Sequence, residues 1–217
     1  MSRILKFDQL ISAVALLLMA FIPVVEILAR PLLGKGVDNA PILVQHLGLV
    51  MSMFGALAAY KLGHLSSIGV MVSTLRAPAR ICAGLNCLLL AWASWHFVST
   101  ERSAHQVLAY SIQVWIFQLV MPIGFLLLGW QIITDGLGSK FIKIMTIAVF
   151  TYLSHLLYGY IDASDISLLP WFAILAVMVL GGAPIFAIIA ALAMGLFWQD
   201  GLPISSIALS HYQITVN

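Results

Sequence analysis

The feature that most limits what this chain can fold into is the length of its uncharged stretches. From Gln9 to Val25 there is no charged residue, and further apolar runs follow along the chain. The 217 residues include only 10 Lys and Arg and 8 Asp and Glu, and the charged fraction is 8%, whereas a soluble domain averages about 25%. So few charges cannot cover a surface that faces water. We therefore predict an all-α integral membrane protein.

The spacing of the breaks between these runs predicts about six transmembrane helices. A helix needs about 20 apolar residues to cross a hydrocarbon core of about 30 Å. Segments that meet this requirement are separated by stretches rich in Gly, Pro, Ser, Asp and charge. The six apolar segments are residues 10–29, 40–60, 81–97, 113–133, 144–160 and 169–198. In the last segment, Pro184 follows two glycines and is expected to kink or break the helix.

The distribution of Lys and Arg predicts the orientation. With a cytoplasmic N-terminus, seven basic residues fall inside and three outside, as the positive-inside rule favours. The inside set is Arg3, Lys6, Lys61, Arg76, Arg80, Lys140 and Lys143, and the outside set is Arg30, Lys35 and Arg102. Six crossings then place both termini in the cytoplasm. The start of the chain resembles a signal peptide, but its apolar run is long and no A-x-A site follows, so we expect it to be retained.

Residues 66–80 are too short to cross a membrane. Apolar residues are mixed there with Ser and Thr, and Arg76 and Arg80 stand near the end. A short amphipathic helix on the cytoplasmic leaflet, with both arginines near lipid headgroups, explains this composition. An ordinary loop is the alternative.

Two pairs of charged residues mark the predicted outer ends of helices. Glu26 and Arg30 are four residues apart and can form an ion pair on one helical face. Glu101 and Arg102 lie in the sequence STERSAH after the third segment. These four residues are predicted to anchor the outer face or to serve as a docking surface. For Arg30 alone, an interfacial anchor is the simpler interpretation, because long basic side chains reach the interface from helix ends.

Small residues recur every four positions in two of the segments. Such rows let helix backbones approach closely in lipid, where the hydrophobic effect does not drive association. We predict that they form helix-packing or partner interfaces, although alanine-rich filler is the alternative. The rows are Gly48, Ser52 and Ala56, with a second row of Gly55, Ala59 and Gly63 in the same segment, and then Ala183, Ala187, Ala191 and Gly195.

No motif for catalysis or nucleotide binding is present, and no enzymatic activity is expected. His46, His96 and His155 lie singly in or near apolar segments, so a haem-binding membrane anchor is one alternative function. Packing histidines are the simpler interpretation. Cys82 and Cys87 are five residues apart, on different faces of a helix, and are expected to be free thiols. A free-standing multispan scaffold is a further alternative.

Two stretches resemble the small membrane subunit of tripartite ATP-independent periplasmic (TRAP) transporters. They are VVEILARPLLGKGVDNAPILVQHLGLVMSMFGALAAYKLGHLSSIGV and IQVWIFQLVMPIGFLLLGWQII. The matching features are an Arg that ends the first helix, a Gly-x-His-like turn after the second, and a W…P-x-G-F pattern in the fourth. In this chain they are Arg30, Gly63, His64, Trp115, Pro122, Gly124 and Phe125. The acidic pair common at the start of the second helix is replaced by Gln45 and His46.

The last part of the chain is similar to the first helix of the large TRAP subunit, on the residues Gly182-Ala183-Pro184. The resemblance implies three parts: a four-helix small-subunit-like domain (residues 1–135), a connector transmembrane helix (136–165) and a helix like the start of the large subunit (166–217). Either a fused small-plus-large transporter or a six-helix small subunit with that helix added fits this order.

The resemblance also implies a location and a function. The location is the bacterial inner membrane. The function is to brace a large transport subunit, which takes up an organic anion with an ion gradient, usually Na⁺, after a periplasmic binding protein delivers it. The partners implied are therefore the large TRAP subunit, the binding protein and lipids, with no nucleic acid. No cofactor, metal, catalytic residue or substrate-binding residue is expected in this chain, because Na⁺ and substrate would bind in the partner.

Overall fold

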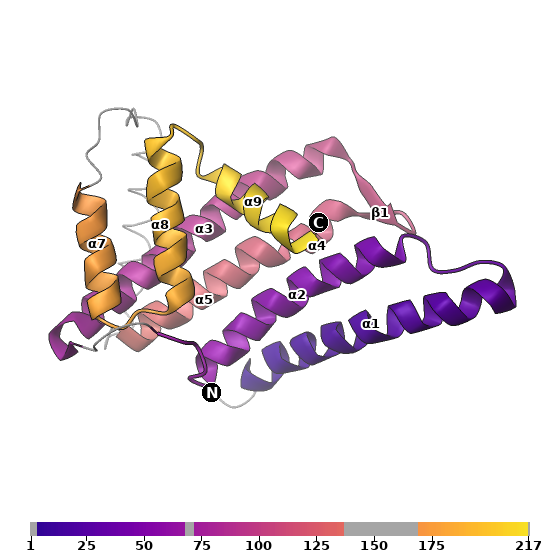
Figure 1. The fold of residues 1–217 in the computed structure, drawn as a ribbon, viewed down its shortest axis with the longest axis horizontal. Helices are drawn as coiled ribbons and strands as arrows, with labels where there is room; N and C mark the ends of the chain where they lie inside the picture. Colours follow the sequence, from indigo (N-terminus) through magenta and orange to yellow (C-terminus); the bar gives the residue numbers. More distant parts are fainter. Residues whose placement is uncertain (1–3, 68–71, 137–168, 217) are drawn as a thin grey trace. The chain divides into compact units, whose positions relative to one another are not determined.

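The structure is a computed structural model that describes residues 4–67, 72–136 and 169–216 (Figure 1). The described residues are mostly helical, with one two-stranded antiparallel sheet. In chain order the elements are α1 (Ile4–Leu33), α2 (Ala40–Lys61), the 3₁₀ helix η1 (Ser73–Leu75), α3 (Arg76–Ala104), β1 (Val107–Ala109), β2 (Ile112–Gln113), α4 (Val114–Gln118), α5 (Val120–Gly136), α7 (Leu169–Leu180), α8 (Ile185–Gln199) and α9 (Ser205–Val216).

Four helical stretches are long and apolar enough to cross a membrane: Phe7–Leu33, Ala40–Lys61, Ser73–Ala104 and Val114–Asp135. They overlap the first four predicted segments. The second, residues 40–60, differs from α2 by one residue, whereas the third, residues 81–97, is seven to eight residues too short at each end. The fifth predicted segment, residues 144–160, lies outside the described residues. Four helices of suitable length and composition thus support the prediction of a helical membrane protein.

The prediction of a single crossing at residues 169–198 is wrong. The structure has two short helices there, α7 with 12 residues and α8 with 15. At about 1.5 Å per residue they measure about 18 and 22 Å, less than the hydrocarbon core of about 30 Å. The break that Pro184 and the preceding glycines predict is confirmed, but it is a reversal of the chain rather than a kink. Gly182, with φ of 72°, has the backbone conformation that such a turn requires and that glycine adopts without strain.

The chain divides into two compact units, which we describe separately. The first contains Met1–His64, Ser94–Gly124 and Ala208–Asn217, and the second contains Leu65–Ala93 and Phe125–Ile207. In the first unit, α1 and α2 run side by side in opposite directions (Figure 1). One face of α1 packs on α2, and its other faces expose large apolar residues, including Phe7, Leu17 and Ile27. This is the pattern expected of a helix at the lipid boundary.

In the second unit, α3 and α5 approach so closely that their backbones touch. A Cβ atom on Gly84 would lie 2.3 Å from Ile133 Cγ1 and 3.1 Å from the Gly129 carbonyl oxygen. A Cβ atom on Gly129 would lie 2.9 Å from the Gly84 carbonyl oxygen. The absence of a side chain at both positions therefore permits this crossing, which is how small residues let helices associate in lipid. The predicted rows of small residues did not include this pair.

The interfacial helix predicted for residues 66–80 is not found in the described part of that stretch. Ser67 forms an isolated β-bridge with Pro184, Val72 is extended, and η1 leads directly into α3. Arg76 and Arg80 therefore occupy the first turns of a membrane-length helix, not a separate surface helix. The reason is a tertiary contact: the backbone of this segment pairs with the turn between α7 and α8.

The sequence analysis also did not predict α9 as a separate element.

Candidate functional site: polar contacts within the helical units

The Glu26–Arg30 ion pair predicted from the sequence is present, with Arg30 Nε 2.6 Å from Glu26 Oε1. The second carboxylate oxygen of Glu26 accepts a hydrogen bond from the backbone N–H of Val37, in the loop between α1 and α2. The Arg30 side chain is largely exposed, whereas that of Glu26 is 15% exposed. Glu26 therefore fastens the loop to the end of α1. The carboxylate at this position therefore has a structural role.

The loop after α1 is also joined to the β1–β2 hairpin. The Asn39 side-chain amide donates to the Leu108 carbonyl oxygen at 2.6 Å, and the Asp38 backbone N–H donates to the Tyr110 hydroxyl at 3.1 Å. The guanidinium of Arg102 lies over the ring of Trp115, 5.3 Å from its centroid. The first unit thus brings both predicted charged pairs to the end where α1, α2 and α3 meet their loops. Arg102 is held by an aromatic ring, a contact the sequence did not predict.

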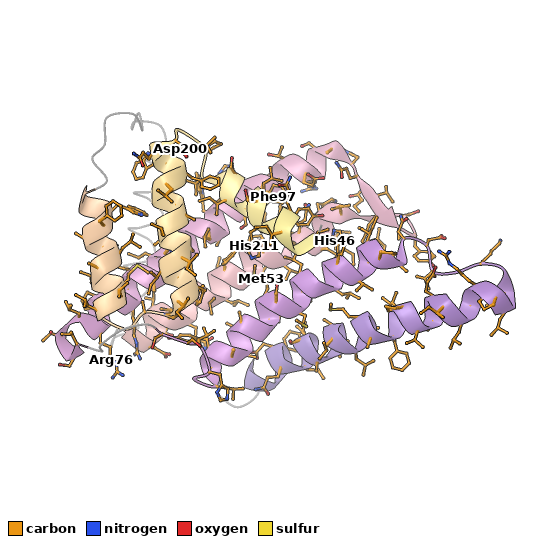
Figure 2. The ribbon with its side chains drawn as sticks, in the orientation of Figure 1. His46, Met53, Arg76, Phe97, Asp200 and His211 are labelled. Atoms are coloured by element: carbon orange, nitrogen blue, oxygen red, sulfur yellow. The ribbon has the colours of Figure 1, made fainter. Side chains whose placement is uncertain are left out.

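A buried polar cluster lies in the first unit around α9, near His46, Phe97 and His211 (Figure 2). His46 on α2 is almost fully buried, with Nδ1 2.8 Å from the Ile42 carbonyl oxygen and Nε2 2.8 Å from the Tyr212 hydroxyl. Because a carbonyl oxygen only accepts, Nδ1 carries the proton, and Nε2 of the neutral ring accepts from Tyr212. The rings of Phe117 and Tyr212 meet the imidazole edge to face.

Further polar groups surround the Tyr212 hydroxyl. Burial raises the pKa of Tyr212, and the negative charge of Glu101 acts in the same direction, while the neighbouring Gln118 side chain opposes both. Gln118 is fully buried and lies beside that hydroxyl, yet neither atom of its amide makes a hydrogen bond of normal geometry. Burial also lowers the pKa of His211. Helix α9 is therefore attached to the first unit by polar contacts inside an apolar surround, where such contacts give specificity to helix association.

The second unit contains the predicted row on α8. Its members Ala183, Ala187, Ala191 and Gly195 are all buried. The Asn86 side chain of α3 donates to the Ala187 carbonyl oxygen at 2.7 Å, and the Trp171 indole of α7 donates to the Ala191 carbonyl oxygen at 2.7 Å. This row therefore packs against helices of this same chain. Asn86 was missed because a single amide in an apolar segment has no distinguishing pattern.

The predicted row on α2 behaves differently. Gly48 faces α1, where its Cβ atom would lie 3.5 Å from Met19 Cε, but Ser52 is exposed and Ala56 is half-buried. The closer contact to α1 is at Gly55 of the second predicted row, where a Cβ atom would lie 3.3 Å from Ser12 Oγ. The α1–α2 contact therefore uses Gly48 and Gly55, seven residues apart. The Gly48, Ser52 and Ala56 row lies only partly within this contact.

A buried ion pair was missed by the sequence analysis. Lys61 Nζ lies 3.0 Å from Asp8 Oδ2, and the two side chains are 12% and 3% exposed. Asp8 and Arg30 are about 33 Å apart along α1 at about 1.5 Å per residue, close to the thickness of a hydrocarbon core. The two ion pairs thus bracket one membrane crossing. The sequence could have predicted this pair. A short loop between two antiparallel helices places the start of the first helix beside the end of the second helix.

The two predicted lipid-contacting arginines lie in the second unit. Arg76 is exposed at the start of α3, and Arg80 Nη1 donates to the Asp135 carbonyl oxygen at 3.1 Å. Arg80 therefore caps the end of α5, where a basic side chain is favourable. Arg80 is thus used to join two helices, and the contact of both arginines with lipid stays a prediction.

Among the described residues, no group of three His, Cys, Asp or Glu side chains is placed to hold a metal ion. Both ring nitrogens of His46 already have hydrogen-bond partners, so ligation of haem iron there would require breaking one of them. His96 lies on an exposed face of α3, and His155 lies outside the described residues. The polar groups brought together in this part of the chain are therefore suited to holding helices in place.

Comparison with known protein families, with curated proteins and with solved structures gave no match to this chain.

Proposed function

We propose that this chain is the small, bracing membrane part of a TRAP-type secondary transporter, in the bacterial inner membrane. It holds a large transport subunit, which uses a Na⁺ gradient to take up an organic anion from a periplasmic binding protein. The Lys and Arg asymmetry supports a cytoplasmic N-terminus for this arrangement. Glu26, Arg30, Glu101 and Arg102 then lie at the outer end, where a binding protein would dock.

The observation that carries this proposal is how the chain uses its few buried polar groups. His46, Asn86 and Trp171 each hydrogen-bond to a neighbouring element, and Asp8 pairs with Lys61. Ionisable and polar groups inside a membrane commonly mark transport or proton pathways, unless they are engaged in packing. The groups just named are engaged in packing. That arrangement favours a role as a rigid brace over a role as a transport site or a haem anchor.

Co-purification from native membranes tests the proposal. Tagged chain, solubilised in mild detergent, is expected to bring down a larger multispan membrane protein. Proteoliposomes that contain both, supplied with the matching binding protein, are expected to show organic-anion uptake that depends on a Na⁺ gradient. Chain that purifies alone, or a Soret band in the purified protein, would favour a free-standing scaffold or a haem-binding anchor instead.

A further inference from the structure

The short helices α7 and α8 form a hairpin within the second unit. The Trp171 indole, near the start of α7, donates to the Ala191 carbonyl oxygen on α8. Its ring fills the space beside Gly195, where a Cβ atom would lie 2.3 Å from Trp171 Cδ1, and meets the Trp198 ring edge to face at 6.2 Å. The start of α7 thus lies beside the end of α8. The chain enters and leaves this hairpin at the same end (Figure 1).

The turn of the hairpin lies at the Arg76 end of α3. A Cβ atom on Gly181 would lie 2.3 Å from Ala79 Cβ and 2.4 Å from the Leu75 carbonyl oxygen. Backbone hydrogen bonds join the turn to the segment before α3, from Val72 N–H to the Leu180 carbonyl oxygen and from Ile185 N–H to the Ser66 carbonyl oxygen. Non-helical backbone inside a membrane requires such partners, because lipid provides none. The turn is therefore built to be buried.

The open end of the hairpin has the composition of a membrane interface. Trp171 and Trp198 lie there, followed by Gln199 and Asp200. Tryptophan is enriched at the level of lipid headgroups, and the polar residues after it are suited to water. The turn, Gly181-Gly182-Ala183-Pro184, has no charged or aromatic residue.

From this geometry we infer that α7 and α8 are a re-entrant hairpin that enters and leaves the membrane on one side, the side of the Ala104 end of α3. This reverses the side that the sequence predicts for the residues after Trp198. The inference therefore predicts that these residues are accessible from the side on which the Ala104 end of α3 emerges.

The first unit provides an independent observation on α9. Tyr212 contacts His46, which is near the Ala40 end of α2, and Phe97, which is near the Ala104 end of α3. Both ends lead into the loops that carry Lys35 and Tyr110. Within the first unit, Tyr212 of α9 therefore lies between these ends of α2 and α3.

Two experiments on the full chain test the inference, in a background with Cys82→Ala and Cys87→Ala. The first is cross-linking of the variant Trp171→Cys with Gly195→Cys by a short bifunctional thiol reagent. In a hairpin the two positions are adjacent, and the cysteine at 195 takes space that the indole has vacated. In one continuous helix they would be about 36 Å apart and would not cross-link. Trp171→Cys with Trp198→Cys provides a second pair, and Trp171→Cys with Ile185→Cys is the control that should not react.

The second experiment is labelling of intact cells with a membrane-impermeant maleimide. Asp200→Cys and Gln213→Cys are expected to label to the same extent as Lys35→Cys and unlike His64→Cys, which lies in the loop after α2. Labelling that matches His64→Cys would overturn the assigned side even if the hairpin cross-links. Failure of both cross-linking pairs would overturn the hairpin itself. Neither result depends on the transport function proposed above.

Discussion

At the scale of single residues, several of the charged and polar side chains inside the units are matched in pairs, whereas the fully buried Gln118 is not. Asp8 pairs with Lys61, Glu26 with Arg30, His46 with Tyr212, and Asn86 with the Ala187 carbonyl oxygen. An unmatched buried charge is far more costly than a matched one, so each pair makes its own stability prediction.

Removing only one member of the Asp8–Lys61 pair should be strongly destabilising. Asp8→Leu leaves the Lys61 ammonium, 12% exposed, without its counter-charge, and we expect the free energy of unfolding to fall by about 3 kcal/mol. The double variant Asp8→Leu/Lys61→Met should recover most of that loss, because an apolar pair of similar volume replaces both charges. Equilibrium unfolding in mixed detergents measures both values. A double variant as unstable as the single one would contradict a pairwise role.

Acidification should weaken the folded state through His211. Burial lowers its pKa in the folded protein, so the unfolded chain takes up a proton first as the pH falls. The associated stability is complete above the ordinary histidine pKa of about 6.5 and is lost as the pH falls through it. We expect His211→Asn to show a smaller loss of thermal stability than the wild type between about pH 7.5 and pH 5.5.

The control for this experiment is His64→Asn, since His64 is exposed in the loop after α2. It should keep the pH dependence of the wild type. If His211→Asn keeps it as well, burial of His211 is not its source.

At the scale of elements, close approach of helices depends on where small residues meet another backbone. Gly84 and Gly129 lie at such a point in the second unit, whereas the space at Gly48 in the first unit is open enough for an ordinary contact. Residues of the same type therefore differ in importance according to the element that faces them.

An added methyl group should have different consequences at Gly84 and at Gly48. Gly84→Ala places a Cβ atom 2.3 Å from Ile133 Cγ1 and 3.1 Å from the Gly129 carbonyl oxygen, so α3 and α5 must separate. We expect the free energy of unfolding to fall by about 1–3 kcal/mol, the usual cost of overpacking. Gly48→Ala, with a nearest contact of 3.5 Å, should be tolerated. Equal melting temperatures for both variants would contradict the close crossing.

The predicted row on α8 and the Gly48, Ser52 and Ala56 row on α2 should also respond differently to a larger residue. Ala187 is fully buried beside Asn86, so Ala187→Leu should destabilise this chain even in the absence of any partner, by about 1–3 kcal/mol. Ser52 is exposed, so Ser52→Leu should leave the isolated chain unchanged. Thermal unfolding of the purified chain compares them. If Ser52→Leu then reduces co-purification of a large subunit, the α2 row contributes to the partner interface that we propose.

At the scale of the whole molecule, the proposed division of labour places ion and substrate binding outside this chain. Glu26 already accepts hydrogen bonds from Arg30 and Val37, and among the described residues no group of three His, Cys, Asp or Glu side chains is placed to hold an ion. Glu26→Gln should therefore loosen the loop after α1 and lower uptake by the assembled transporter.

The apparent Na⁺ affinity of the remaining uptake should not change in that variant. Proteoliposome uptake measured over a range of Na⁺ concentrations separates the two quantities. A shift of severalfold in half-saturating Na⁺, with unchanged yield of the complex, would contradict the division of labour.

The sequence by itself determined the features that depend on local composition. Long uncharged runs specify apolar helices wherever they occur, so the membrane character, the bounds of α2 and the break before Pro184 could be read directly. The spacing of Glu26 and Arg30 likewise determines a contact within a single helix. Each of these requires only the 3.6-residue period or the thickness of the bilayer.

Only the tertiary structure decided which residues meet across the chain. The Asp8–Lys61, His46–Tyr212 and Asn86–Ala187 contacts join residues far apart in sequence, and each depends on how helices are rotated and on where the chain reverses. Periodicity cannot distinguish a kink from a reversal at Pro184, since both leave the same two apolar helices. The reversal is decided by contacts with Leu75 and Ala79, which stabilise the turn by replacing the partners that lipid cannot provide.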